Sequence, residues 1–233
     1  MKKEAFTLAE VLITIGVIGI VIAMTLPSLI ENRKKTVIET RLKKFYTSIN
    51  QAIMMSENVN GEKTTWTPKD TKEFWDIYLK NHIKYTKAED WENAIGTRNK
   101  KIVFLPDGSA VIIDIYFAED STGVITNTTY GGHFIFCPEA KYCKKEVYEK
   151  VKYTQIGKNI FYFGFWPNET TEQFKYHKNK GVEAYKANWD GNPDSLYTHP
   201  LHGCNNNANR YFCTAVIERN GWTIPKNYIK ISN

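Results

Sequence analysis

The stretch FTLAEVLITIGVIGIVIAMTL, residues Phe6–Leu26, decides how this chain is organised. It is apolar except for a few threonines and one carboxylate, Glu10. About 20 consecutive apolar residues can cross a bilayer as a helix, whereas the apolar core of a secretory signal has only about 7–15. A charge at the bilayer centre costs about 2.5–3.5 kcal/mol on insertion scales. We therefore expect a membrane-spanning helix over about residues 6–30, in which Glu10 needs a partner.

The residues that precede and open this stretch, Met1–Leu12, read MKKEAFTLAEVL. This segment resembles the processing site of type IV pilins and type II secretion pseudopilins. The resemblance implies that residues 1–5 are a leader, that a prepilin peptidase cuts between Ala5 and Phe6, and that Phe6 is then methylated. Glu10 matches the family's acidic fifth residue of the processed chain, and the proline at position 27 falls where the family often kinks the helix. The sequence departs from the family at Ala5, where glycine is the rule, and at Ala9, where a larger aliphatic residue is usual.

Cleavage would create an α-amine, and in a filament this cation could pair with Glu10 of a neighbouring subunit. In a low dielectric such a pair offsets much of the desolvation cost of the carboxylate. Alternatively Glu10 snorkels to the interface, since it lies only about 7 Å along a helix from Phe6. Gly16 and Gly19 either permit close helix approach or are simply tolerated in a membrane helix.

The remainder of the chain has the composition of a folded, water-soluble domain. Of 233 residues, 42% are hydrophobic and 24% charged, and the formal charge of +6 falls to +5 when the leader is lost. The lysines are scattered, which favours solubility, and nucleic-acid binding is not predicted. Lys2 and Lys3 favour a cytoplasmic amino end, whereas Arg33, Lys34 and Lys35 argue the other way. The resemblance of the leader to the family's processing site implies a cytoplasmic amino end and a single-pass inner-membrane precursor. Residues 59–233 would then form an extracytoplasmic domain that becomes part of a periplasmic or cell-surface filament.

Four cysteines form two close pairs in sequence: Cys137 with Cys143, and Cys204 with Cys213. An even count on an exported domain indicates disulfides. Three connectivities are possible, of which we prefer local pairing, with each bond stabilising the fold by about 2–3 kcal/mol. The alternative is buried free thiols in a reducing compartment.

Apolar residues at three- and four-residue spacing extend the first helix over residues 6–58, with a bend expected at Pro27. A second helix is expected from Thr67-Pro68-Lys69-Asp70 to about Asn81. One face of this helix is apolar and mostly aromatic, and its side chains are expected to lie in the core: Phe74, Trp75, Tyr78 and Leu79.

Strand patterns follow in the second half of the chain. Residues 101–105 and 109–117 flank a Pro-Asp-Gly turn and predict a hairpin. A short strand is expected over residues 133–137, and a further strand pair over 147–155 and 160–165. From Pro167 onwards the chain is irregular and polar, with a last apolar stretch over residues 211–217.

The sequence contains no nucleophile elbow, phosphate-binding glycine loop or zinc-protease motif, so no enzyme is expected. His199, His202 and Cys204 are metal-ligand types, but they lie in a polar loop beside an expected disulfide. Asp190, Asn192 and Asp194 have the alternation of a calcium loop, although Asp, Gly, Asn and Pro also make ordinary turns. We expect neither a metal nor a cofactor.

These observations predict an α+β protein in which a long amino-terminal helix, transmembrane in its first half, packs on an antiparallel sheet. The resemblance implies a filament subunit whose partners are prepilin peptidase, other pilin or pseudopilin subunits and, before assembly, membrane lipid. One alternative is a filament-tip module that captures DNA or another ligand. Another is an extracytoplasmic protein that keeps an uncleaved signal anchor.

Overall fold

The computed structural model describes residues 7–91, 99–119, 125–206 and 209–231. The expected cleavage site between Ala5 and Phe6 therefore lies outside the described residues. The chain divides into two compact units, one of residues 1–37 with 231–233 and the other of residues 38–230. Helix α1, Leu8–Asn60, is continuous from the first unit into the second and includes Pro27 without a break. The chain is α+β, as the sequence predicts.

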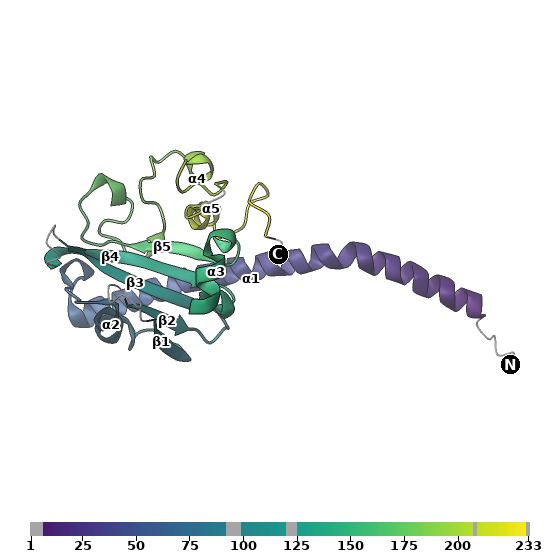
Figure 1. The fold of residues 1–233 in the computed structure, drawn as a ribbon, viewed down its shortest axis with the longest axis horizontal. Coiled ribbons are helices and arrows are strands. Elements are labelled where there is room, and N and C mark those ends of the chain that lie inside the picture. The colour runs from purple at the N-terminus through teal and green to yellow at the C-terminus, as the bar shows by residue number, and fades with distance from the viewer. Residues whose placement is uncertain (1–6, 92–98, 120–124, 207–208, 232–233) are drawn as a thin grey trace. The chain divides into compact units, whose positions relative to one another are not determined.

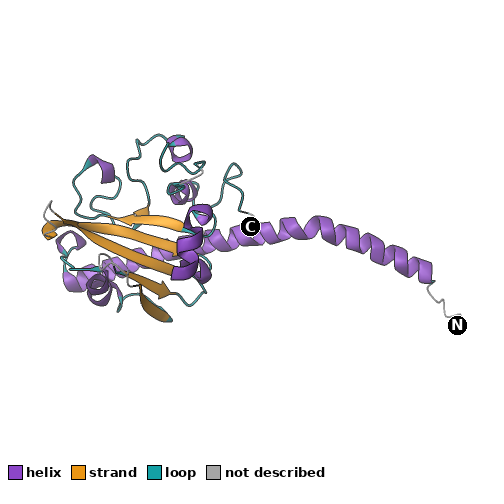
Figure 2. Cartoon of the chain, viewed as in Figure 1, coloured by secondary structure: helices purple, strands orange, loops and turns teal. Residues whose placement is uncertain are grey.

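A six-stranded sheet forms the centre of the 38–230 unit (Figure 2). The strands lie in sequence order and every neighbouring pair is antiparallel. Their bounds are β1 Lys87–Trp91, β2 Lys100–Phe104, β3 Ala110–Glu119, β4 Ile125–Cys137, β5 Phe161–Phe165 and β6 Glu183–Ala184. The predicted hairpin is confirmed as β2–β3, and Gly108 in its turn has φ +82°, a conformation that glycine adopts without a steric penalty.

The second half of α1 packs on one face of this sheet, behind it in Figure 1. Phe45 stacks on Phe136 of β4, with ring centroids 4.6 Å apart, and meets Phe163 of β5 edge-on at 5.2 Å. The buried residues recur every three or four positions along the helix, so they form one apolar stripe. They are Ile38, Leu42, Phe45, Ile49, Ala52, Ile53 and Ser56.

The opposite face of the sheet is covered in part by α3, Lys145–Gln155. The sequence prediction of a strand over residues 147–155 is wrong. Val147, Val151 and Tyr153 suggest a two-residue alternation, yet only Tyr148 of this element is buried. Its ring contacts Trp91 of β1 edge-on at 5.5 Å. Between the apolar positions lie glutamates and lysines, which are good helix formers, so an exposed helix with a single anchor is favoured.

The segment after α1 confirms the expected aromatic core. Asp70 caps α2, Thr71–Phe74, by accepting a hydrogen bond from the Glu73 N–H at 2.7 Å. The helix continues as a π-helical turn, Trp75–Leu79. Phe74, Trp75, Tyr78 and Leu79 are all buried. The shorter elements are η1 Lys63–Thr65, η3 Ala140–Cys143, η4 Glu172–Phe174, α4 Ser195–Thr198 and α5 Cys213–Arg219.

Polar side chains of α1 hold the irregular carboxy-terminal third. The Asn50 amide donates to the Val182 carbonyl and accepts from the Val182 N–H, both at 2.9 Å. The Glu39 carboxylate accepts from the Ile224 N–H at 2.8 Å. Tyr46 donates to Glu183 at 3.3 Å and lies against Trp222, with ring centroids 4.9 Å apart. These contacts satisfy backbone groups that a loop-rich segment cannot pair with itself.

Candidate functional site

The first turn of α1 is built around Glu10. Its carboxylate accepts hydrogen bonds from the Thr7 N–H and the Thr7 hydroxyl, both at 2.8 Å, and the Glu10 N–H donates back to the Thr7 hydroxyl at 3.3 Å. This reciprocal pattern is a capping box, which satisfies N–H groups that the first helical turn leaves without partners. Glu10 thus has a partner within its own helix, a role that the sequence analysis missed although the Thr-x-x-Glu spacing signals it.

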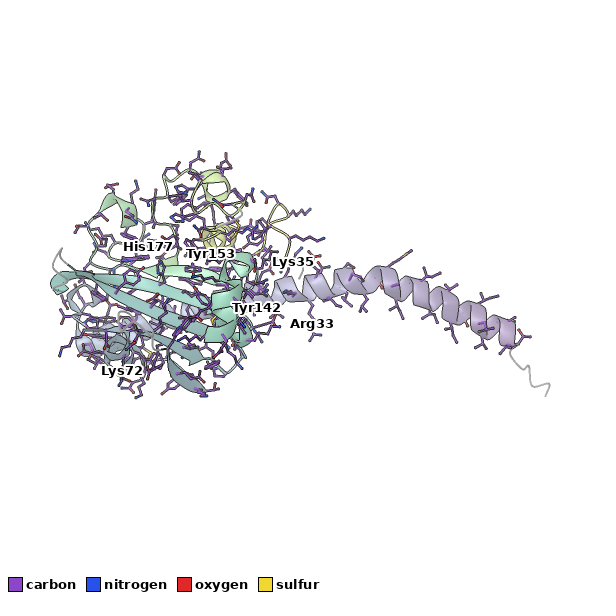
Figure 3. All side chains as sticks on the ribbon, in the orientation of Figure 1. Arg33, Lys35, Lys72, Tyr142, Tyr153 and His177 are labelled. Carbon is purple, nitrogen blue, oxygen red and sulfur yellow. A yellow bond between two sulfur atoms is a disulfide. The ribbon has the colours of Figure 1, made fainter. Side chains whose placement is uncertain are left out.

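The apolar stretch after Glu10 is exposed all round. Every side chain from Thr7 to Ile30 is exposed, and in Figure 3 these side chains project outward from the whole circumference of the helix. An isolated chain in water would not leave such a surface uncovered. In the described part of the chain, one helix, α1, is long and apolar enough to cross a membrane.

Polar groups within this stretch are satisfied by the helix itself. The Thr14 hydroxyl donates to the Glu10 carbonyl, and the Thr25 hydroxyl to the Val21 carbonyl, each at 2.9 Å. Such internal bonding is what a bilayer interior requires of hydroxyl groups. A side chain added at Gly16 or Gly19 would meet nothing within 4 Å in this chain. Both glycines therefore stay open to a neighbouring helix, or are tolerated without one.

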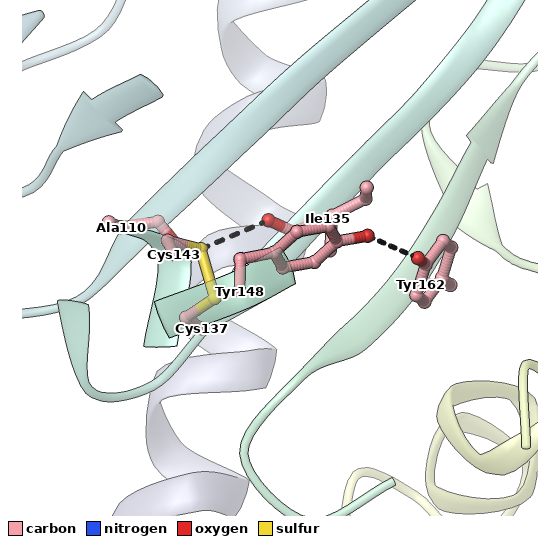
Figure 4. The surroundings of a disulfide bond; sticks show 6 residues. All are labelled: Ala110, Ile135, Cys137, Cys143, Tyr148 and Tyr162. Carbon is pink, nitrogen blue, oxygen red and sulfur yellow. Dashed lines mark hydrogen bonds between the residues drawn. A yellow bond between two sulfur atoms is a disulfide. The ribbon is translucent and has the colours of Figure 1, made fainter. Parts of the chain in front are cut away.

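The four cysteines are paired locally, as preferred from the sequence. Disulfides join Cys137 to Cys143 and Cys204 to Cys213. The first closes the end of β4 onto η3, and its Cys143 sulfur lies 3.6 Å from the Ile135 carbonyl (Figure 4). Both bonds lie inside the 38–230 unit, where they tether the irregular segments beside the sheet.

Beside the first disulfide, two tyrosines are buried against each other (Figure 4). The hydroxyls of Tyr148 and Tyr162 are 2.5 Å apart. Burial raises the pKa of both phenols, so both stay protonated at physiological pH. The pair joins α3 to β5 by a hydrogen bond shielded from water. It is a structural contact that the sequence could not signal, because its members are 14 residues apart on different elements.

A small ionic cluster lies nearby on the same face of the sheet. The Lys100 ammonium contacts the Asp114 carboxylate at 2.9 Å, and the Tyr116 hydroxyl lies 2.8 Å from Nδ1 of His133. Asp114 is paired with His133 across β3 and β4. The other Asp114 oxygen is buried and has no hydrogen-bond partner among the residues that the structure describes. Lys100 neutralises the carboxylate, so the cluster is an internally paired group on the sheet.

The histidine and acidic loops do not form metal sites in the part of the chain that the structure describes, where no group of three or more potential ligands converges. The Cys204 sulfur is consumed by its disulfide. His199 Nδ1 instead accepts the Leu201 and His202 N–H groups. The Asp190 carboxylate accepts from Ser195 and from the Asn192 N–H, bonds that lower the pKa of Asp190. The loop is a hydrogen-bonded turn.

Comparison with protein families matches residues 28–230 to the Family of unknown function (DUF6613). The chain belongs to this family. No curated protein and no solved structure matches it. The matched region begins just after Pro27, so it contains the sheet domain and both disulfides. It leaves out the apolar stretch and Glu10.

The family membership and the amino-terminal resemblance therefore concern different parts of the chain. The DUF6613 region defines the domain, and it carries no assigned activity. The features with a specific chemical signature lie before it, in the exposed apolar helix with its single carboxylate. Any function for this member of the family must account for both parts.

Proposed function

We propose that this chain is a structural subunit of a type IV pilus or a type II secretion pseudopilus, made as an inner-membrane precursor and assembled through its amino-terminal helix. The observation that carries the proposal is the lone carboxylate of Glu10 in a fully exposed apolar helix, at the fifth position after the expected cut at Ala5-Phe6. A helix that is apolar all round needs lipid or other helices around it. The membrane would surround the helix of the precursor with lipid, and the filament would then surround the same helix with helices of other subunits.

The capping box supports a two-stage use of Glu10. In the membrane precursor, Thr7 supplies two hydrogen bonds to the carboxylate, which reduces the cost of holding a charge in the apolar helix. After cleavage, the methylated amine of Phe6 in a neighbouring subunit supplies the missing positive charge. In a low dielectric the attraction between the two charges offsets their desolvation, whereas either charge left alone is strongly unfavourable. It would therefore fix the axial register of the packed helices.

The first experiment is mass spectrometry of the mature protein. We expect an amino terminus at N-methylated Phe6. A chain that still begins with Met1 in assembled or surface material would contradict the proposal and favour an uncleaved signal anchor.

The second experiment separates charge from capping in a matched pair of variants. Glu10→Gln keeps the capping box, because glutamine serves at this position, but it removes the negative charge. Thr7→Ala keeps the charge and removes the hydroxyl of the cap. We expect Glu10→Gln to be inserted and processed but at least about tenfold depleted from sheared filaments, and Thr7→Ala to assemble. Equal incorporation of Glu10→Gln and wild type would overturn the charge-pairing mechanism.

A further inference from the structure

A groove runs along α1 within the 38–230 unit, and neither the fold nor the proposed filament role requires it. Its volume is about 400 Å³. One wall is the α1 face from Arg41 to Met55, and the opposite wall comes from residues 82–84 and from the β2–β3 turn at residues 105–109. Fourteen helical steps extend about 21 Å, so the groove is elongated. Its volume is in the range of small-molecule sites, about 300–1,000 Å³.

The bottom of the groove is apolar and rigid. Phe45 is only 2% exposed, and its ring is fixed by stacking on Phe136 at 4.6 Å. Leu105, Pro106 and Met55 add further apolar surface. An apolar molecule in this groove would displace water from a surface that is already held in place by the core, which limits the cost of ordering the site.

The rim carries more positive than negative charge. Asp107 is the acidic residue among the lining groups, and it is already engaged: its carboxylate contacts the Lys44 ammonium at 2.9 Å and accepts the Ser109 N–H at 3.1 Å. Arg41 donates to two backbone carbonyls, those of Pro138 and Asp107. Among the described residues, no carboxylate forms an ion pair with Arg41 or with the exposed Lys84. Among the described residues, Arg41 and Lys84 therefore line the groove without a paired carboxylate, and the Lys84 ammonium is the exposed one of the two.

We propose that this groove binds a small amphipathic anion: an apolar body on Leu105, Pro106 and Met55, with a carboxylate, phosphate or sulfonate group at the cationic rim. The argument rests on charge complementarity above a preformed apolar floor. It does not depend on the filament role. The same chemistry could come from a free solute or from the headgroup region of an anionic lipid, and the experiment distinguishes the two sources.

The methionines provide a built-in reporter. Both Met54 and Met55 are exposed, but Met55 lines the groove and its neighbour Met54 does not. The full chain, labelled with 13C at the methionine methyl groups, is placed in nanodiscs of zwitterionic lipid and titrated with naphthalene-2-sulfonate. We expect a saturable ring-current shift of the Met55 methyl signal with Met54 unchanged, and no such shift with neutral naphthalene-2-methanol at equal concentration. A shift of Met55 in nanodiscs containing phosphatidylglycerol, without the probe, would identify lipid as the source of the anion.

Two variants, each with a matched control, test the site itself. Lys84→Glu should weaken sulfonate binding about tenfold, whereas Lys178→Glu, at another exposed lysine, should not. Ser48→Phe fills the groove and should abolish the Met55 response, whereas Thr47→Phe, one residue along and outside the groove, should preserve it. Unchanged Met54 and Met55 signals in the wild type, equal shifts of both, or equal binding of the neutral probe would overturn the proposal.

Discussion

The two halves of α1 form one continuous helix but differ in which of their side chains are exposed and which are buried. From Thr7 to Ile30 every side chain is exposed, although most of them are apolar. From Ile38 to Ser56 the buried residues keep to one stripe, and that stripe meets the aromatic face of the sheet. Both halves are α-helical, so the difference lies in the distribution of polar side chains around the helix.

This comparison explains why the family match and the amino-terminal pattern separate where they do. The second half must fit one particular sheet, and its large residues are tied to positions on that sheet by close packing. Under the proposed function, the first half has only to be apolar all round and to place a single acid near its start. The physical demands on the two halves are therefore independent.

The largest expected effect comes from making the same substitution in each half. Ile49→Ala removes a side chain that is 1% exposed and should lower the free energy of unfolding of the 38–230 unit by about 2–5 kcal/mol. Ile18→Ala, at a position that is 57% exposed, should change it by less than about 0.5 kcal/mol. Denaturant unfolding of the full chain in nanodiscs, followed by tryptophan fluorescence, measures both. Similar losses in the two variants would mean that the halves are not independent.

The two disulfides should affect the stability of the 38–230 unit and not the first half of α1. Replacing Cys204 and Cys213 together by serine should lower the free energy of unfolding by about 2–3 kcal/mol. Replacing Cys137 and Cys143 should cost slightly less, because the loop that this pair closes is shorter, with a sequence separation of 6 against 9. Membrane insertion of α1 should be unchanged in both. Loss of insertion in either variant would show that the first half of α1 depends on the folded domain.

Acid should also destabilise the folded domain selectively, through His177. This residue is fully buried, and burial together with the nearby Lys186 ammonium lowers the pKa of His177 to about 3 (its position is labelled in Figure 3). Its ring accepts the Lys186 N–H at 3.0 Å, and Gly164 leaves the space that the ring fills. The unfolded chain binds a proton below about pH 6.5 whereas the folded chain does not, so stability falls as the pH falls from 6.5 towards 3.

Between pH 7 and pH 5 this residue alone should cost about 2 kcal/mol of stability. Unfolding free energies measured across that range should therefore fall more steeply in the wild type than in His177→Gln, whose side chain does not titrate. Parallel pH profiles would show that His177 gains its proton without unfolding the domain.

The smallest effect is expected at the end of the first half of α1. Lys35 forms a half-buried ion pair with Glu31 one helical turn earlier, at 2.9 Å. Lys35→Ala should cost no more than about 0.5 kcal/mol, and the loss should shrink at high salt. A loss above 1 kcal/mol that does not depend on salt would indicate that this turn contributes packing rather than charge.

Sequence reasoning succeeded where a pattern is local. The stripe of α1, the Pro-Asp-Gly hairpin, β5 and the short-range cysteine pairs all follow from residues close together in the chain. It failed for residues 147–155, where an apparent alternation of apolar residues outweighed the helix-forming glutamates and lysines. It also missed β1 and β6, because polar edge strands such as Lys87–Trp91 lack an alternating apolar signal and exist only through pairing with a neighbour.

The candidate sites divide in the same way. The acid and the expected processing residues can be read from Met1–Leu12, where the Thr7 cap was available too, and the apolar stretch from Phe6–Leu26. The groove could not be read, because Lys84, Asp107 and Phe45 come from three separate segments. By itself the sequence determined the apolar helix, the elements with strong local periodicity and the position of Glu10 in that helix, since these depend on spacing along the chain. Only the tertiary structure decided which cations are left without a counter-charge, which histidine is buried and which helix covers each face of the sheet, because burial and pairing depend on residues that folding brings together.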